Sequence, residues 1–450
     1  MKNFFSQQTS LKLWQVWLVF FVFTMLVATC VQLVIIPAFA SAWSANAGLL
    51  TAGDSASFHE KAVILARTVR EQGWSAWYLW PDGQGPAGIA GAIYAVTTSQ
   101  PWVLIPLNAA LHATSGILLM LILELFISNR RIAFCSAIPF IVFPSAMIWY
   151  AQIHKDSYTI PGSLLFILGW ALLTHLETWK NGKFIFAAAF VFIGSFFIWL
   201  MRPYQVEIFQ LLAAFSSVGL FALYINWLLN KKWGVHLFFF ACAMIGMLIF
   251  SLTPFVKNTP LTNPSLSNLK PLPASPRVIN WQNSGWLPAT LENKILAFSE
   301  ARENYIAVSG NSDLDENVHF HNIGDVVRYL PRALQLGLFS PFPNLWFGNG
   351  SAPENTLMRR VSIFETLWVY LGLAGFLGLF RRACSRPDFW LITYFCVTMI
   401  LSYSMVVVNV GTLYRFRYAF LMLLVSMGYS YWLNRWYKDK SSLTKSAPVA

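Results

Sequence analysis

The chain has 450 residues, of which 56% are hydrophobic and only 11% are charged, and its net charge is +12. This little charge cannot cover a soluble globule, so composition excludes a soluble domain and indicates a membrane protein with several spans. The basic residues stand in short clusters between apolar runs, as in positive-inside loops, so no nucleic-acid partner is expected.

Apolar runs long enough to cross a bilayer recur about ten times along the chain. These runs are 13–37, 101–127, 132–150, 158–176, 184–200, 206–229, 235–256, 361–380, 389–408 and 413–432. The first run exceeds the core of a signal peptide and lacks a cleavage context, so we expect a retained first span. The five cysteines show no metal-type spacing and no shared hydrophilic segment, so neither a disulfide framework nor a thiolate metal site is expected.

The positions of the basic clusters indicate how these spans are oriented in the membrane. The segment 86–98 is too short and too rich in glycine to cross, and leaving it uncrossed places every later basic cluster on the side of Lys2 and Lys12. We therefore predict an all-α polytopic fold with cytoplasmic termini and interfacial helices in the first outer loop. The expected parts are listed in chain order: an N-terminal transmembrane module 1–256 with the outer loop 38–100, a long outer loop 257–360, C-terminal helices 361–435 and a cytoplasmic tail 436–450.

The first outer loop contains an amphipathic pattern over residues 53–74. Apolar residues recur at three- and four-residue spacing, which predicts a helix lying on a membrane surface. The apolar positions are Phe58, Ala62, Leu65, Ala66 and Val69. Asp54 or Ser55 is expected to begin this helix and Gly73 to end it. On this stretch alone, Asp54 is most simply a helix cap.

Ionisable residues also stand in three very short outer loops. His154, Lys155 and Asp156 are consecutive, Arg202 precedes Glu207, and Arg415 and Arg417 lie between the last two predicted spans. One such base is readily explained as snorkelling to headgroups. Several on the outer side run against the positive-inside bias, and a lipid phosphate would explain them, because guanidinium and ammonium groups bind phosphate oxygens. Asp54 and Asp156 are then candidates for a general base or a metal ligand.

The order of these features resembles the GT-C superfamily of integral membrane glycosyltransferases. Asp54, Phe58-His59 and Ala62 resemble the Asp-x-x-x-aromatic-His-x-x-Ala signature of its bacterial protein-mannosyltransferase-like branch, and the stretch 411–417 is similar to a late Gly-x-x-Arg-Tyr-Arg segment.

The resemblance implies a polyprenyl-phosphate sugar donor and a catalytic acid in the first loop. It assigns catalysis to Asp54 with support from Asp156, and it assigns donor-phosphate contacts to Lys155, Arg202, Arg415 and Arg417. Many members have two adjacent acids in the first loop, whereas Ser55 follows Asp54 here, which argues against a two-carboxylate metal site at that point. Supporting roles are expected for His59, His154, Glu207, Arg328 and Arg332.

The long outer loop begins with an extended connector, 258–276, and contains a helical pattern at 291–305 and another at 326–338 that is interrupted by Pro331. The aromatic and proline-rich stretch 339–346 suits either sugar stacking or a plug packed on the membrane helices. His319 and His321 would point to one side of an extended segment, but no third ligand follows by spacing, so metal dependence stays open and no organic cofactor is expected. Asn108 and His112 are one helical turn apart and are expected to face the bundle interior.

These features predict a glycosyltransferase in a membrane, taken to be the bacterial inner membrane, with its active site on the outer face. It would move a sugar from a polyprenyl-phosphate donor to a glycan or lipid-linked acceptor, with inversion and general-base catalysis. One alternative is an O-antigen polymerase or ligase that uses an undecaprenyl-diphosphate-linked donor. A second is a lipid-linked glycan transporter, which would be expected to carry internal repeats and charges deep in the membrane; neither an obvious repeat nor a chain of such charges is found.

Overall fold

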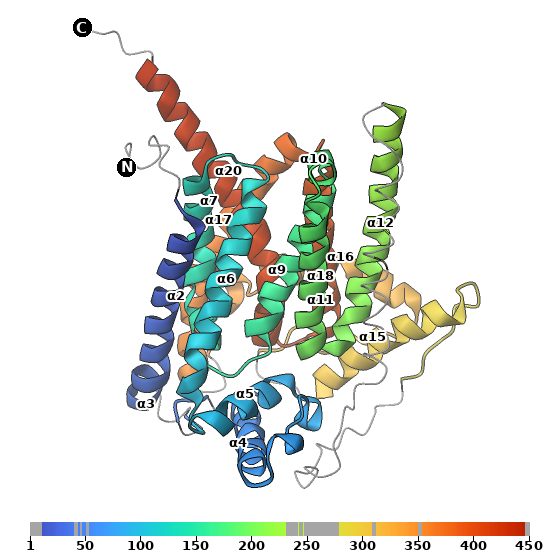
Figure 1. Cartoon of the computed structure of the whole chain (residues 1–450). Coiled ribbons are helices and arrows are strands. Elements are labelled where there is room, and N and C mark those ends of the chain that lie inside the picture. Colours follow the sequence, from blue (N-terminus) through green and yellow to red (C-terminus); the bar gives the residue numbers. More distant parts are fainter. Residues whose placement is uncertain are drawn as a thin grey trace. The chain divides into compact units, whose positions relative to one another are not determined.

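The computed structural model describes residues 11–39, 44–45, 47–50, 54–230, 242, 246, 279–307, 312–349 and 353–445. Within these ranges the chain consists of helices and connecting turns and contains no β-strand (Figure 1). The predicted all-α fold class is therefore confirmed for this part of the chain.

Seven helical segments of the described chain are long and apolar enough to cross a membrane. They are Leu13–Phe39, which comprises α2 (Leu13–Cys30), η1 (Val31–Ile35) and α3 (Ile36–Phe39); Pro101–Glu124, which comprises η5 (Pro101–Leu104) and α6 (Ile105–Glu124); α9 (Asp156–Leu173); α11 (Phe184–Met201); α12 (Val206–Leu229); Thr356–Ala383 within α17 (Pro353–Ala383); and α18 (Pro387–Val406). Each overlaps one predicted span, so several membrane-spanning helices are present as expected.

The predicted span 132–150 is broken. Helices α7 (Arg130–Val142) and α8 (Pro144–Tyr150) meet at a bend of 66°, and they give an eighth span only if both are counted as one. Phe143 between them has an extended ψ of 127°. The ring of Pro144 causes this, because a proline disfavours helical geometry in the residue before it and offers no N–H to the preceding turn.

Two further predicted spans have different outcomes. The run 235–256 lies outside the described residues, apart from positions 242 and 246, as does the connector 258–276. The run 413–432 is not one helix: α19 (Val410–Phe416) ends at Arg417, and α20 (Tyr418–Lys445) begins after it. Two arginines at the start of this run, Arg415 and Arg417, interrupt its apolar character where the helix breaks. The described residues therefore do not reach the ten spans expected.

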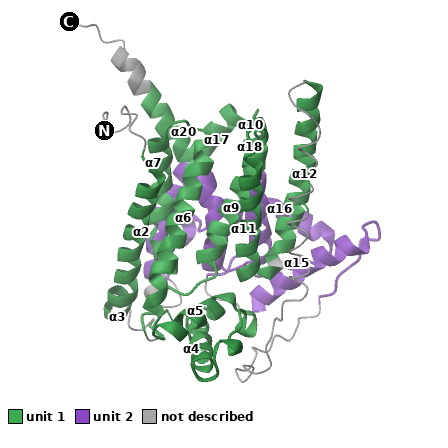
Figure 2. Cartoon of the chain, in the orientation of Figure 1, with its two compact units in different colours: residues 1–268, 375–392, 426–450 green, residues 269–374, 393–425 purple. Residues whose placement is uncertain are grey.

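The chain divides into two compact units (Figure 2). Unit 1 comprises residues 1–268, 375–392 and 426–450, and unit 2 comprises 269–374 and 393–425. The later helices α17, α18 and α20 each contribute to both units, a division that the sequence-based scheme did not contain.

Close packing of α9 against α11 forms the centre of unit 1. A Cβ added to Gly162 would lie 3.0 Å from the carbonyl oxygen of Gly194, and one added to Gly194 would lie 2.5 Å from that of Gly162. Only glycine permits this approach of two backbones, which is a common way for membrane helices to associate without a hydrophobic driving force.

Two short helices of the first loop lie across one end of unit 1, and α2 begins at the opposite end (Figure 1). They are α4 (Ser55–Gln72) and α5 (Gly85–Val96), and all five predicted apolar positions of α4 are buried. The helix ends at Gly73 as predicted, with a positive φ of 87° that suits glycine. Helix α5 has 12 residues, so it measures about 18 Å and is too short to span.

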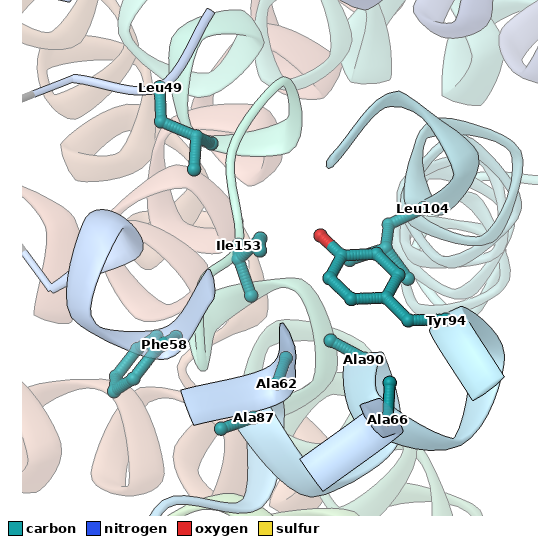
Figure 3. Close-up of a cluster of buried hydrophobic side chains, with 9 residues drawn as sticks. All are labelled: Leu49, Phe58, Ala62, Ala66, Ala87, Ala90, Tyr94, Leu104 and Ile153. Atoms are coloured by element: carbon teal, nitrogen blue, oxygen red, sulfur yellow. The ribbon is translucent and has the colours of Figure 1, made fainter. Parts of the chain in front are cut away.

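The core between α4 and α5 also receives residues from other segments. Ile153, from the turn between α8 and α9, lies among the alanines of both helices (Figure 3). The first loop is thereby packed onto the turn that carries the predicted site residues His154, Lys155 and Asp156.

Unit 2 contains α15 (Ala289–Ala307), α16 (Ile323–Phe339), η8 (Pro343–Leu345) and α19, together with parts of α17, α18 and α20. The helical patterns predicted at 291–305 and 326–338 are confirmed as α15 and α16. The interruption predicted at Pro331 is wrong, because Pro331 lies inside α16 without breaking it.

Candidate active site

The turn between α8 and α9 is buried, and its peptide groups are bonded by side chains from distant helices. Loops are seldom buried because their backbone polar groups then need partners inside the protein. Gln32 Nε2 donates to Ala151 O at 2.7 Å. Asn108 Nδ2 donates to Tyr150 O at 3.0 Å and to Gln152 O at 2.9 Å. The side chain of Gln152 donates through Nε2 to Gly48 O at 3.0 Å, and its Oε1 accepts from Leu50 N at 2.9 Å. The turn is therefore fixed before any ligand arrives.

Two of the bundle positions expected to be buried are so. Asn108 is 5% exposed and His112 is fully buried, and the His112 ring lies 4.0 Å from that of Tyr150. Asn108 supports the turn directly, as given above. His112 instead hydrogen-bonds the Ile141 carbonyl oxygen at 3.2 Å, so it holds α6 to α7.

Asp156 and Arg202 form a buried ion pair. Arg202 Nη2 donates to Asp156 Oδ1 at 2.8 Å, and the side chains are only 3% and 4% exposed. Arg202 follows the last residue of α11 and Asp156 opens α9, so the pair ties the adjacent ends of the two central helices together. Sequence reasoning selected both residues but did not predict that they pair. Such a pair orients the neighbouring turn, and breaking it leaves a buried charge uncompensated.

The N-terminus of α4 contacts the same turn. Ser55 Oγ donates to Ile153 O at 3.1 Å and lies 3.3 Å from His154 Nε2. One turn further along α4, the Lys155 ammonium lies 5.7 Å from the centre of the Phe58 ring. Asp54 precedes Ser55 at the start of α4, so the backbone of Asp54 lies beside the segment that carries His154 and Lys155.

The geometry of Asp54 differs from that of a helix cap. It occupies the N-cap position of α4 with helical angles, and its side chain makes no capping hydrogen bond. The residue is exposed, whereas Ser55 is buried. Capping therefore does not account for an acid at this position.

His59 lies on the side of α4 that faces α5. Its Nδ1 shares a hydrogen bond of 3.0 Å with the hydroxyl of the buried Tyr94, and burial lowers the pKa of His59 below its ordinary value. His59 is therefore neutral near pH 7 and holds α4 to α5.

Glu207 is exposed in the first turn of α12, where a negative charge stabilises the helix N-terminus.

The two late arginines differ sharply from each other. Arg415 is half-buried, with its guanidinium 5.5 Å from the Phe416 ring centre. Arg417 is fully buried. Its guanidinium donates to the carbonyl oxygens of Leu336 (2.7 Å) and Gly337 (2.6 Å), to Ser340 Oγ (3.1 Å) and to Ser340 O. Arg417 thus caps the C-terminus of α16, a structural role that the sequence did not predict.

Replacing Arg417 by Gln is expected to destabilise the protein by about 2–4 kcal/mol, because it leaves buried carbonyl groups of α16 without donors. Thermal unfolding in detergent measures this effect, and Arg415→Gln is the matched control with little expected change. A stable Arg417→Gln protein that had lost affinity for a lipid phosphate would instead restore Arg417 to the ligand-binding set.

Arg328 and Arg332 lie on α16. Arg328 is exposed. Arg332 is paired with Asp315 through two hydrogen bonds of 2.8 and 3.0 Å, and its guanidinium lowers the pKa of Asp315. A neighbouring residue that sequence reasoning did not select, Arg302, is 1% exposed and donates to three carbonyl oxygens, those of Val318, Met405 and Asp315. These contacts make the α15–α16 region a packed substructure.

One histidine side chain of this region, that of His319, has a carboxylate partner. His319 Nδ1 lies 2.6 Å from Glu303 Oε1, and the His319 and His321 rings are 6.4 Å apart. Among the described residues, no group of three or more His, Cys, Asp or Glu side chains is placed to hold a metal ion.

Sequence reasoning gave Ser55 only a possible capping role and gave Gln152 none, although both join the predicted residues together. Both are short polar residues without a motif, and Gln152 could be recognised only by its place beside a row of ionisable residues. In comparisons with known proteins, no family model, curated protein or solved structure matches this chain.

Proposed function

We propose that this protein is a membrane glycosyltransferase that moves a sugar from a polyprenyl-phosphate donor to a glycan or lipid-linked acceptor. The observation that supports it best is the contact between Ser55 and the Ile153–His154 segment. It brings the backbone of Asp54, an exposed acid whose side chain makes no capping hydrogen bond, next to a fixed turn that carries Lys155. A transfer reaction of this kind needs a general base and a cation close to each other at the membrane surface.

In the proposed reaction, Asp54 removes the proton from an acceptor hydroxyl. The hydroxyl oxygen bonds to the anomeric carbon, and the bond from that carbon to the phosphate oxygen breaks. The electron pair leaves with the polyprenyl phosphate, whose charge Lys155 stabilises, and attack opposite the leaving group inverts the anomeric carbon. Asp156 and Arg202 do not react; they hold the turn in place.

We further propose that α4, α5 and the turn lie on the outer face of a bacterial inner membrane, with both termini in the cytoplasm. The basic clusters between the spans support this orientation through the positive-inside bias.

The experiment is transfer in proteoliposomes supplied with polyprenyl-phosphate sugars one at a time and with membrane glycan extracts as acceptors. The proposal expects release of polyprenyl phosphate and a labelled acceptor with at least one donor. Transfer only from a diphosphate-linked donor would support the polymerase or ligase instead.

One observation favours the transporter as a second candidate. Glu365, 2% exposed, lies inside the apolar helix α17 and accepts a hydrogen bond of 2.8 Å from the Tyr414 hydroxyl. A buried acid within a membrane span often marks a transport pathway. Movement of a labelled lipid-linked glycan between leaflets, without release of polyprenyl phosphate, would favour this candidate.

A further inference from the structure

Four segments far apart in sequence are joined into a closed circuit of contacts at the α4 end of unit 1. Ser55 of α4 contacts His154, Asp156 pairs with Arg202, Trp80 Nε1 donates to Leu200 O at 2.9 Å, and Asp82 pairs with Lys61 of α4 at 3.5 Å. On α4, Phe58, which contacts Lys155, lies between Ser55 and Lys61. The circuit thus contains a third carboxylate, Asp82, which the sequence did not single out.

The turn that carries Asp82, η4 (Pro81–Gly83), has an unusual backbone. Asp82 has φ 48° and ψ 37°, a left-handed conformation, and Gly83 follows with φ 74°. Gly83 N donates to Trp80 O (3.1 Å) and Gln84 N to Pro81 O (3.0 Å). Left-handed residues other than glycine are uncommon, and they gather at functional sites when surrounding structure holds them.

Packing fixes this turn on the end of α11. The Trp80 indole is bonded to Leu200 O, and its ring meets that of Trp199 edge-on at 4.8 Å. At Gly85 an added Cβ would lie 2.4 Å from Leu200 O, so the backbone has no room to move closer. Arg202 is two residues after Leu200, so the turn that carries Asp82 is fixed close to the Asp156–Arg202 pair in the chain.

We propose that the Lys61–Asp82 pair binds the hydroxyl groups of the donor's sugar, and that this sugar is uncharged. The inference rests on the proposed function. The side chains of Lys61 and Asp82 are 15% and 20% exposed, so both reach solvent while remaining oriented. The carboxylate accepts hydrogen bonds from sugar hydroxyls, and the ammonium donates to others.

Charge decides the class of sugar. Lys61 and Asp82 together are neutral, so they offer no net attraction for an acidic sugar, whose carboxylate would also meet the Asp82 charge. The half-buried Trp80 adds an aromatic surface of the kind that packs on the C–H groups of a pyranose. The donor phosphate is left to Lys155, whose ammonium lies over the ring of Phe58, three residues before Lys61 on α4.

The test compares farnesyl phosphate with farnesyl phosphate carrying one neutral hexose (glucose, mannose or galactose), both bound to the full chain in phosphatidylcholine nanodiscs. We expect Asp82→Asn and Asp82→Gly to weaken binding of the preferred hexose-bearing probe about tenfold and to leave the sugar-free probe unchanged. Glycine tolerates the left-handed backbone, so Asp82→Gly removes the carboxylate without straining the turn. Glu177→Gln, which removes the exposed ion pair with Lys180, is the control and should change neither affinity.

Each remaining outcome overturns a different statement. If replacing Asp82 weakens the binding of both probes equally, or weakens the binding of neither, the sugar-binding role is overturned. If the wild-type protein binds both probes with equal affinity, the sugar-binding role is also overturned, whereas recognition of a lipid phosphate is supported. A wild-type protein that binds neither probe removes the proposed function itself. Tighter binding of a probe that carries glucuronic acid overturns the assignment to an uncharged sugar.

Discussion

Replacing Asp54 by Asn is expected to lower the rate of sugar transfer by about 10²- to 10⁴-fold, because general-base catalysis contributes an effect of that size. The fold should be retained, since the Asp54 side chain makes no capping hydrogen bond. Asparagine keeps the size and polarity of the side chain but does not accept a proton at neutral pH. The measurement is the initial rate of polyprenyl phosphate release, with thermal unfolding recorded on the same preparation.

The matched control for Asp54 is Glu60→Gln, which neutralises another exposed acid of the same helix. It should transfer at the wild-type rate. Full activity of Asp54→Asn would refute the catalytic assignment, whereas equal losses in both variants would indicate a general effect of charge on α4.

Breaking the Asp156–Arg202 pair should give the largest loss of stability. Arg202→Met leaves the Asp156 carboxylate buried without its guanidinium, and removing one partner of a buried ion pair typically destabilises a protein by about 3–5 kcal/mol. Asp156→Asn should have a comparable effect from the other side. We expect both variants to unfold at a lower temperature and to lose transfer, because the turn that carries Lys155 loses its anchor.

The double variant Asp156→Asn/Arg202→Met separates pairing from other roles. It should be more stable than the sum of the single losses predicts, since no uncompensated charge remains. Additive losses would mean that the two side chains act independently, and a stable but inactive Asp156→Asn protein would give Asp156 a direct role in the chemistry. Thermal unfolding of the three variants and the wild type completes this cycle.

Patterns within one segment were read correctly from sequence. The apolar face of α4, its end at Gly73 and the inward-facing Asn108 and His112 follow from the 3.6-residue period, which depends on a residue and its near neighbours along the chain. Most spans follow from length and hydropathy for the same reason. The break at Phe143 was missed although its cause, Pro144, is also local.

Pairings between segments could not be read in this way. Ser55 meets His154 across 99 residues, and Arg202 meets Asp156 across 46. Arg415 and Arg417 look alike in sequence, yet one is half-buried and the other caps α16 across 77 residues. Asp82 was passed over because an Asp-Gly pair predicts only a turn.

The amino-acid sequence by itself determined that the protein is helical, that it enters the membrane repeatedly, and which face of each amphipathic helix is buried. Only the tertiary structure decided which charges meet, which arginine is structural, and that Lys61 and Asp82 lie in the same circuit as Asp156 and Arg202. The reason is physical: periodicity and hydropathy act through neighbours along the chain, whereas a partner for a buried charge is supplied by whichever segment packs against it.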